Sequence, residues 1–230
     1  MPPASYPAGA TEYEILFVTS GTINPTSGNP STYNAFVTSQ ANEAGSIVPS
    51  GLTWNAVVST QLTLQTGIIR KITNYNASSL APSSAGIPVY NTAGQLITNL
   101  GLYSASQLSA LPEYNQFGNL EQTAVATGSS ASGTGSDPLG SSGNWNIGQS
   151  NMGNSSNTAA KWISSDAENG LNDAFAIYAL SAPIQIRPAV VPEPMTLTLL
   201  GTGLVAYCGY RRLKRGRPPK QSDDEADQAG

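Results

Sequence analysis

The sequence predicts a single α+β domain followed by a C-terminal tail of different composition. Residues 13–20, YEILFVTS, are rich in β-branched and aromatic side chains and end at Gly21, which is typical of a buried strand. Residues 31–44 instead repeat apolar side chains every three or four positions, which indicates a helix. Residues 173–186, DAFAIYALSAPIQI, again favour a strand. A chain of 230 residues accommodates one such domain with appendages.

The other elements follow in chain order. In the helix, Ser31 is the expected N-cap and Gly45 follows the C-terminus. The alternation of apolar side chains in 52–58 indicates a strand, and 86–97 reads as a hairpin around Asn-Thr-Ala-Gly. We expect a short helix in 102–113 stopped by Pro112, and a long loop from Gly128 to Asn157. Residues 158–165, TAAKWISS, predict a helical turn or a short strand.

Composition excludes several kinds of chemistry. The chain has no histidine, and its single cysteine is Cys208, so catalytic pairs and zinc sites that need these residues cannot form. Only 10% of the residues are charged, so hydroxyls and amides must make up most of the surface. We therefore expect no catalytic residue, no cofactor and no metal.

Carboxylates leave one alternative open, because glycan hydrolases work with a pair of them. One candidate pair is Glu12 with Glu14. Alternatively, a cleft would have to bring together any two carboxylates of a second set: Glu113, Glu121, Asp166, Glu168 and Asp173. Solvated surface carboxylates are the simpler interpretation. A calcium site would draw on oxygen ligands without an EF-hand spacing, from Asp166, Glu168, Asn169, Asn172 and Asp173. Trp54, Trp145 and Trp162 favour a core over a sugar platform.

The tail combines three features in a fixed order. Pro192, Glu193 and Pro194 precede an uncharged run from Met195 to Tyr210. As a helix this run spans about 24 Å, close to the bilayer's hydrocarbon thickness of about 30 Å, so we expect a transmembrane helix over 195–210. The basic residues that follow would place the C-terminus in the cytoplasm and the domain outside: Arg211, Arg212, Lys214 and Arg215.

These three features together resemble the PEP-CTERM sorting signal of bacteria. The resemblance covers about residues 190–215 and implies export, retention in the inner membrane, and processing near the Pro-Glu-Pro motif by an exosortase. The product would reach the cell surface or an exopolysaccharide matrix. The opening residues lack the signal peptide that this route requires, which suggests a start site placed too far downstream. The tail is also about 15 residues longer than is usual for the family.

Two further resemblances are looser. Segments including STYNAFVTSQ, AGIPVYNTAGQLI, YNQFGN and AAKWISSD occur in the order seen in endostatin-like domains, which implies a C-type-lectin-like fold over about 13–186. The cysteines and calcium motifs of those families are missing, so sugar binding is not implied. Arg215-Gly216-Arg217-Pro218 resembles the core of an AT-hook, which implies minor-groove DNA binding.

The predicted organisation has five parts: a disordered N-terminus (1–12), an exported domain (13–187), a Pro-rich linker (188–194), a transmembrane helix (195–210) and a cytoplasmic tail (211–230). The leading hypothesis is a bacterial envelope protein with a non-catalytic binding or structural ectodomain. Its partners would be an exosortase, membrane lipid and matrix polysaccharide. A glycan hydrolase and a DNA-associated protein remain as alternatives.

Asn76-Ala-Ser and Asn154-Ser-Ser also match the pattern for N-linked glycosylation, which has little meaning in most bacterial proteins.

Overall fold

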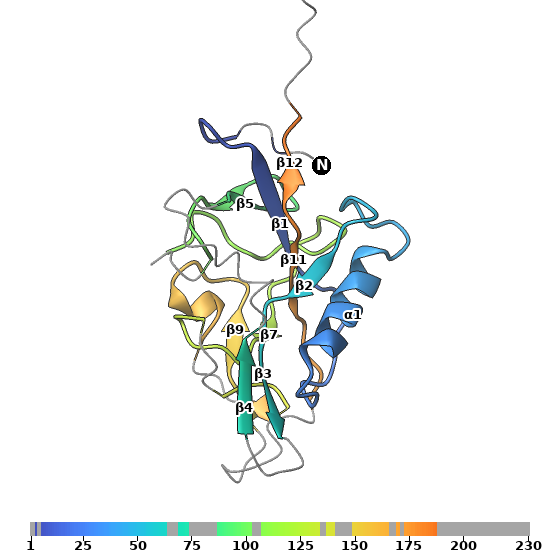
Figure 1. Cartoon of the computed structure of the whole chain (residues 1–230), viewed down its shortest axis with the longest axis vertical. Coiled ribbons are helices and arrows are strands. Elements are labelled where there is room, and N and C mark those ends of the chain that lie inside the picture. The colour runs from blue at the N-terminus through green and yellow to red at the C-terminus, as the bar shows by residue number, and fades with distance from the viewer. Residues whose placement is uncertain are drawn as a thin grey trace, which may run out of the picture. The chain divides into compact units, whose positions relative to one another are not determined.

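A computed structural model describes residue 3 and residues 6–63, 69–73, 87–102, 107–133, 137–140, 149–165, 169–170 and 173–187 (Figure 1). The chain divides into two units after Ile186. The first unit contains every helix and strand described here.

A mixed sheet of six strands organises this unit. Its central strand is β1 (Glu12–Val18), which is antiparallel to β11 (Tyr178–Ser181) and β12 (Ile184–Gln185) and parallel to β5 (Val89–Asn91). The edges of the sheet are β2 (Trp54–Ala56) and β6 (Leu96–Thr98). The first strand of the chain is therefore enclosed by strands from its middle and its end (Figure 1).

Both faces of β1 are covered, which explains its apolar run over residues 15–18. Tyr13, Ile15 and Phe17 belong to one apolar cluster, in which the rings of Phe17 and Trp54 lie 5.0 Å apart. Leu16 and Val18 point to the other face and join a second cluster that includes Trp162. The expectation that Trp54 and Trp162 are core residues is confirmed, since both are buried.

The helix α1 (Pro30–Ala41) packs beside β2 and confirms the helix predicted for this region (Figure 1). Its N-cap is Asn29 rather than Ser31: the Asn29 side chain accepts a hydrogen bond from Ser31 N at 3.0 Å, and Pro30 occupies the first helical turn. The helix ends at Ala41, before the predicted Ala44. Asn34 Oδ1 accepts a hydrogen bond from Ala56 N at 2.8 Å, so the helix also covers the sheet edge at β2.

Short strand pairs and one turn of helix form the rest of the unit. The pairs are β3 (Ser59–Thr63) with β4 (Ile69–Thr73), β7 (Ala124–Ala126) with β9 (Met152–Asn154), and β8 (Gln149–Ser150) with β10 (Asn169–Gly170). A 3₁₀ helix, η2 (Ala160–Trp162), confirms the turn predicted in 158–165. The predicted hairpin is also confirmed, as β5 and β6. No helix is seen at residues 102 and 107–113, the described part of the segment where one was expected.

The fold class needs correction. We expected a C-type-lectin-like α+β domain with one C-terminal transmembrane helix; the described residues instead form a small, sheet-dominated domain with a mixed sheet and a single α-helix. Within these residues, no helix combines the length and apolar character needed to cross a bilayer. The run 195–210, where that helix was predicted, lies outside the described residues.

The segment predicted as a disordered N-terminus, residues 1–12, makes ordered contacts with the sheet. The ring of Tyr6 lies 5.3 Å from that of Tyr13 and 6.2 Å from that of Tyr90. The segment before β1 is thereby held against the sheet.

Candidate functional site

Two of the candidate carboxylates meet in one hairpin, residues 113–121, which we call the acidic hairpin. Its strands are joined by an antiparallel bridge between Tyr114 and Leu120 and by a hydrogen bond from Glu121 N to Glu113 O at 2.6 Å. Glu113 and Glu121 are therefore directly opposite each other. Side chains in this relation project from the same face of a two-stranded ribbon.

Amide side chains hold both carboxylates. Gln122 Nε2 donates to Glu113 Oε2 at 2.8 Å, and Asn115 Nδ2 donates to Glu121 Oε2 at 3.2 Å. Glu113 is 8% exposed and Glu121 is half-buried. Hydrogen bonds from these amides fix the orientation of each carboxylate, as a site with two positioned acids requires.

The turn of the acidic hairpin is built by Asn115 and Gly118. Asn115 Oδ1 accepts hydrogen bonds from Phe117 N at 3.0 Å and from Asn119 N at 3.1 Å. Gly118 adopts a positive φ of 76°, which glycine reaches without steric cost. Asn115 therefore both shapes the turn and positions Glu121.

Gln116 attaches the acidic hairpin to the rest of the domain. Its buried side chain accepts a hydrogen bond from Ser20 N at 3.1 Å and donates to Ser20 Oγ at 2.8 Å. Gln116 Nε2 also lies 3.3 Å from Gln40 Oε1 on α1, and Ile47 N donates to the Gln116 carbonyl at 2.9 Å. The hairpin is thus fixed to the end of β1 and to the helix.

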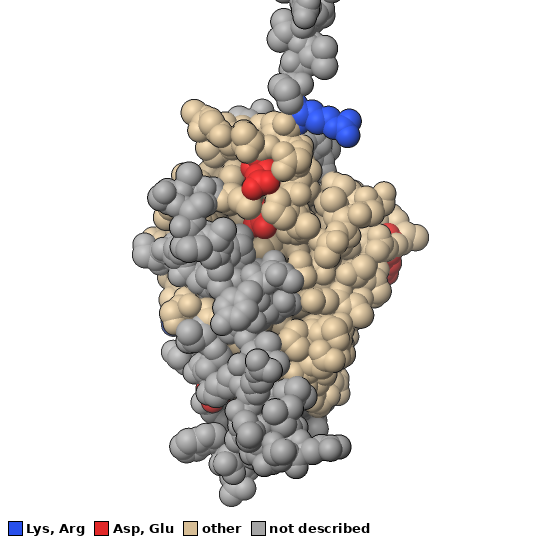
Figure 2. Space-filling model, in the orientation of Figure 1, with Lys and Arg blue, Asp and Glu red and all other residues tan. Residues whose placement is uncertain are grey.

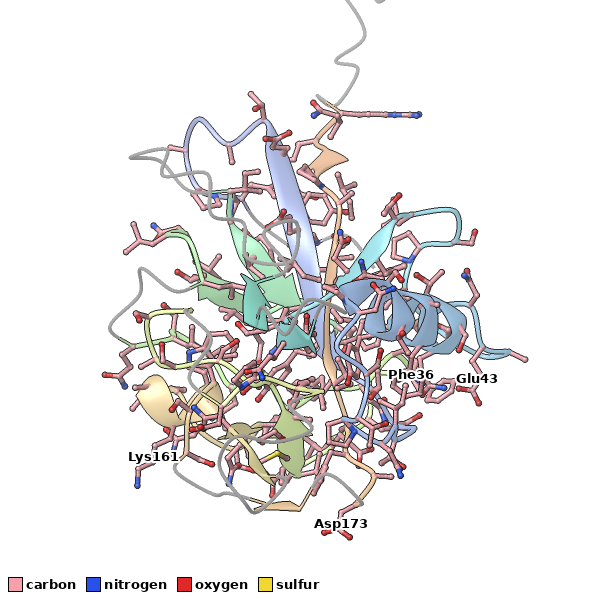
Figure 3. The ribbon with its side chains drawn as sticks, turned by 60° about the horizontal axis from the view of Figure 1, so that its bottom comes forward. Phe36, Glu43, Lys161 and Asp173 are labelled. Atoms are coloured by element: carbon pink, nitrogen blue, oxygen red, sulfur yellow. The ribbon has the colours of Figure 1, made fainter. Side chains whose placement is uncertain are left out.

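The remaining candidate carboxylates do not join this pair. Asp173 is exposed, and Figure 3 shows it apart from Lys161 and from Glu43 at the end of α1. Glu12 accepts a hydrogen bond from Gln185 Nε2 at 2.9 Å, and Glu14 is buried within β1. Asp166, Glu168 and Asn172 lie outside the described residues, and only the backbone of Asn169 is described. Within the described part of the chain, no group of acidic side chains is arranged to hold a metal ion.

The residues of the expected sorting signal are not described either. This concerns the motif Pro192, Glu193 and Pro194, the basic residues Arg211, Arg212, Lys214 and Arg215, and the AT-hook-like sequence that follows. Trp145 also lies outside the described residues.

The described surface carries little charge, as the composition predicts. Among the side chains that the structure describes, the exposed charged ones are Glu43, Lys161, Asp173 and Arg187. Figure 2 shows one face on which uncharged residues predominate. The described surface therefore offers a partner few charged groups.

Sequence reasoning named Glu113 and Glu121 but not the amides that hold them. The signal was a turn sequence, Asn115-Gln116-Phe117-Gly118-Asn119, with a glutamate two residues before it and another two residues after it. A scan of protein-family models and a search of curated proteins found no match to this chain.

Proposed function

We propose that the chain is a bacterial cell-envelope protein that is exported and processed at Pro192-Glu193-Pro194, and that its folded domain is a non-catalytic binding or structural module. One observation carries this proposal: the fold closes just before the motif. Ile186 N donates a hydrogen bond to Thr11 O at 2.8 Å, and the first compact unit ends at Ile186. Pro192 follows six residues later. Cleavage there would remove none of the strands that the structure describes.

The uncharged surface supports a polysaccharide matrix as the destination. A hydrated glycan offers hydroxyl groups, and the exposed hydroxyls and amides of this domain are suited to hydrogen bonds with them. Because such contacts involve few ion pairs, we expect binding to a neutral polysaccharide to change little between low and high salt. A charged ligand would instead be released by salt.

The sorting proposal is tested by replacing the motif. When the full chain is expressed behind a signal peptide, cells that carry a matching exosortase should convert it into a shorter form whose C-terminus, measured by intact mass, lies near Pro192. The variant Pro192→Ala/Glu193→Ala/Pro194→Ala should keep its full mass. A matched control, Pro218→Ala/Pro219→Ala, changes prolines in the same tail outside the motif and should be processed normally. Equal processing of the motif variant and the parent chain contradicts the proposal.

The opposed glutamates of the acidic hairpin favour a second candidate function, glycan hydrolysis. In that reaction one carboxyl protonates the leaving oxygen, and the second acts as a base or nucleophile. If Glu113 and Glu121 have these roles, Glu113→Gln and Glu121→Gln should each abolish the release of reducing ends from a matrix polysaccharide. Asp173→Asn, the same kind of change at an exposed site, should leave this activity unchanged. A parent chain without activity on any polysaccharide tested removes this candidate.

A further inference from the structure

A turn that follows β9 presents an asparagine to solvent, and we propose that Asn154 is an acceptor for an N-linked glycan. Asn154-Ser155-Ser156 matches the acceptor pattern, in which the third residue carries a hydroxyl. The pattern alone occurs often by chance, so the inference depends on how the fold presents it. It also rests on the proposed export, because transferases of this class act on chains that cross a membrane.

The middle residue of the tripeptide anchors the turn. Ser155 is buried, and its backbone N donates to Thr123 O at 3.1 Å. Its Oγ donates to Glu121 O at 2.6 Å and accepts from Thr123 N at 2.8 Å. Asn154 itself ends β9 and pairs with Ala124 of β7. The turn is thus fixed to the body of the domain at Asn154 and Ser155.

The two residues that a glycosyltransferase must reach are both exposed. Asn154 Oδ1 accepts a hydrogen bond from Ser156 N at 2.8 Å, and Asn157 N donates to Asn154 O at 3.2 Å. Asn154 and Ser156 are both exposed to solvent. Among the hydrogen bonds of the described residues, none involves Asn154 Nδ2 or Ser156 Oγ. The reacting nitrogen and the recognised hydroxyl therefore face solvent from one ordered turn.

The donor would be an oligosaccharide linked to a lipid through pyrophosphate. A bond forms between Asn154 Nδ2 and the first sugar carbon while the bond from that carbon to the pyrophosphate oxygen breaks. The lipid pyrophosphate leaves with the electron pair, and the amide gives up one proton to a base of the transferase. The reaction consumes one donor for each glycan and needs no oxidant or reductant.

The test uses the folded full chain with Asn76→Gln, so that Asn154 belongs to the one remaining acceptor tripeptide. The chain is incubated with a purified oligosaccharyltransferase and a lipid-linked oligosaccharide, and the products are read by intact mass and peptide mapping. We expect one glycan, on Asn154. Ser156→Ala keeps the backbone N–H that binds Asn154 Oδ1 but removes the hydroxyl, and should abolish the modification. Ser156→Thr should retain it, and Asn157→Gln, a change in the same turn outside the tripeptide, should leave it unaffected.

Two results would overturn the inference. One is an unmodified folded chain under conditions in which the heat-unfolded chain is glycosylated. The other is an exported, processed protein from its own host whose Asn154 is unmodified; export itself would then stand. If the protein is not exported, the sorting proposal fails, and the reaction with the purified transferase still decides whether the fold presents Asn154.

Discussion

At the residue scale, Tyr33 shows how a buried phenol makes stability depend on pH. Its hydroxyl donates to Ser27 O at 2.9 Å and accepts from Ser27 N at 3.1 Å. Burial raises the pKa of Tyr33 from 10.0 to about 12, although the hydrogen bond to Ser27 lowers it. Burial also raises the pKa of Tyr178, whose hydroxyl donates to Trp162 O at 3.1 Å. Both phenols are therefore neutral in the folded chain at pH values where the unfolded chain ionises them.

We expect the free energy of unfolding to fall as the pH rises from about 10 to about 12. Across this range the folded chain keeps protons that the unfolded chain loses, so the stabilisation is complete below the unfolded pKa of 10.0 and is lost as the pH approaches the folded value. Tyr33→Phe should reduce this slope and cost about 1 kcal/mol at neutral pH through the lost hydrogen bonds. Urea unfolding at a series of pH values measures both effects. An unchanged slope in the variant would contradict the assignment to Tyr33.

Individual residues also show how much of the structure the sequence predicts. The Asn29-Pro30 pair contains the capping signal, since proline favours the first turn of a helix and the residue before it becomes the cap; Ser31 therefore lies within the first turn and not at the cap. Glu113 and Glu121 were recognised as candidates because carboxylates are scarce. The sequence does not predict their pairing, because the turn at Asn115 that places them opposite each other is stabilised by side-chain hydrogen bonds. Such bonds leave no periodic pattern in the sequence.

At the scale of elements, β9 and η2 approach each other too closely for a side chain between them. A Cβ added to Gly153 would lie 2.1 Å from the Trp162 carbonyl oxygen. Since the backbone on both sides is fixed, one element would have to move.

Gly153→Ala should therefore destabilise the domain by about 3 kcal/mol, the upper range for overpacking a close contact. The control is Gly51→Ala, where the φ of 78° strains an alanine but no atom lies within 4 Å. Its cost should be about 1–2 kcal/mol, from the backbone alone. Thermal unfolding of both variants separates the steric effect from the conformational one. A Gly153→Ala variant as stable as the parent chain would show that β9 and η2 adjust freely.

Elements with a local sequence signal can be predicted, whereas the pairing of the strands into a sheet cannot. Three signals are local in the sequence: the apolar run of β1, the apolar periodicity of α1 and the turn between β5 and β6. The structure contains the strand, the helix and the hairpin that they predict. The parallel pairing of β1 with β5 depends on contacts distant in sequence. Residues 124–126 and 152–154 form strands of three residues each, too short for alternation to distinguish them from the surrounding loop.

At the scale of the whole molecule, the folded unit should not need the tail. A chain that ends after Arg187 keeps β12 and the hydrogen bond from Ile186 N to Thr11 O. We expect its free energy of unfolding to equal that of the full chain within about 0.5 kcal/mol. A chain that ends after Pro183 loses β12 and should be measurably less stable. Chemical denaturation of the three chains tests this, and a large loss at Arg187 would show that later residues stabilise the domain.

The position of β1 also has a kinetic consequence. Ile15 N donates to Ser181 Oγ across 166 residues of sequence, and the strand pairs with β11 and β12 along its length. The first strand made is thus among the last to be completed by its partners, and contacts of such long range slow folding. Until β11 has left the ribosome, Leu16 and Phe17 lack their partners Leu180 and Ala179. A chain of this topology completes its central sheet late in synthesis, and its apolar first strand needs protection from aggregation until then.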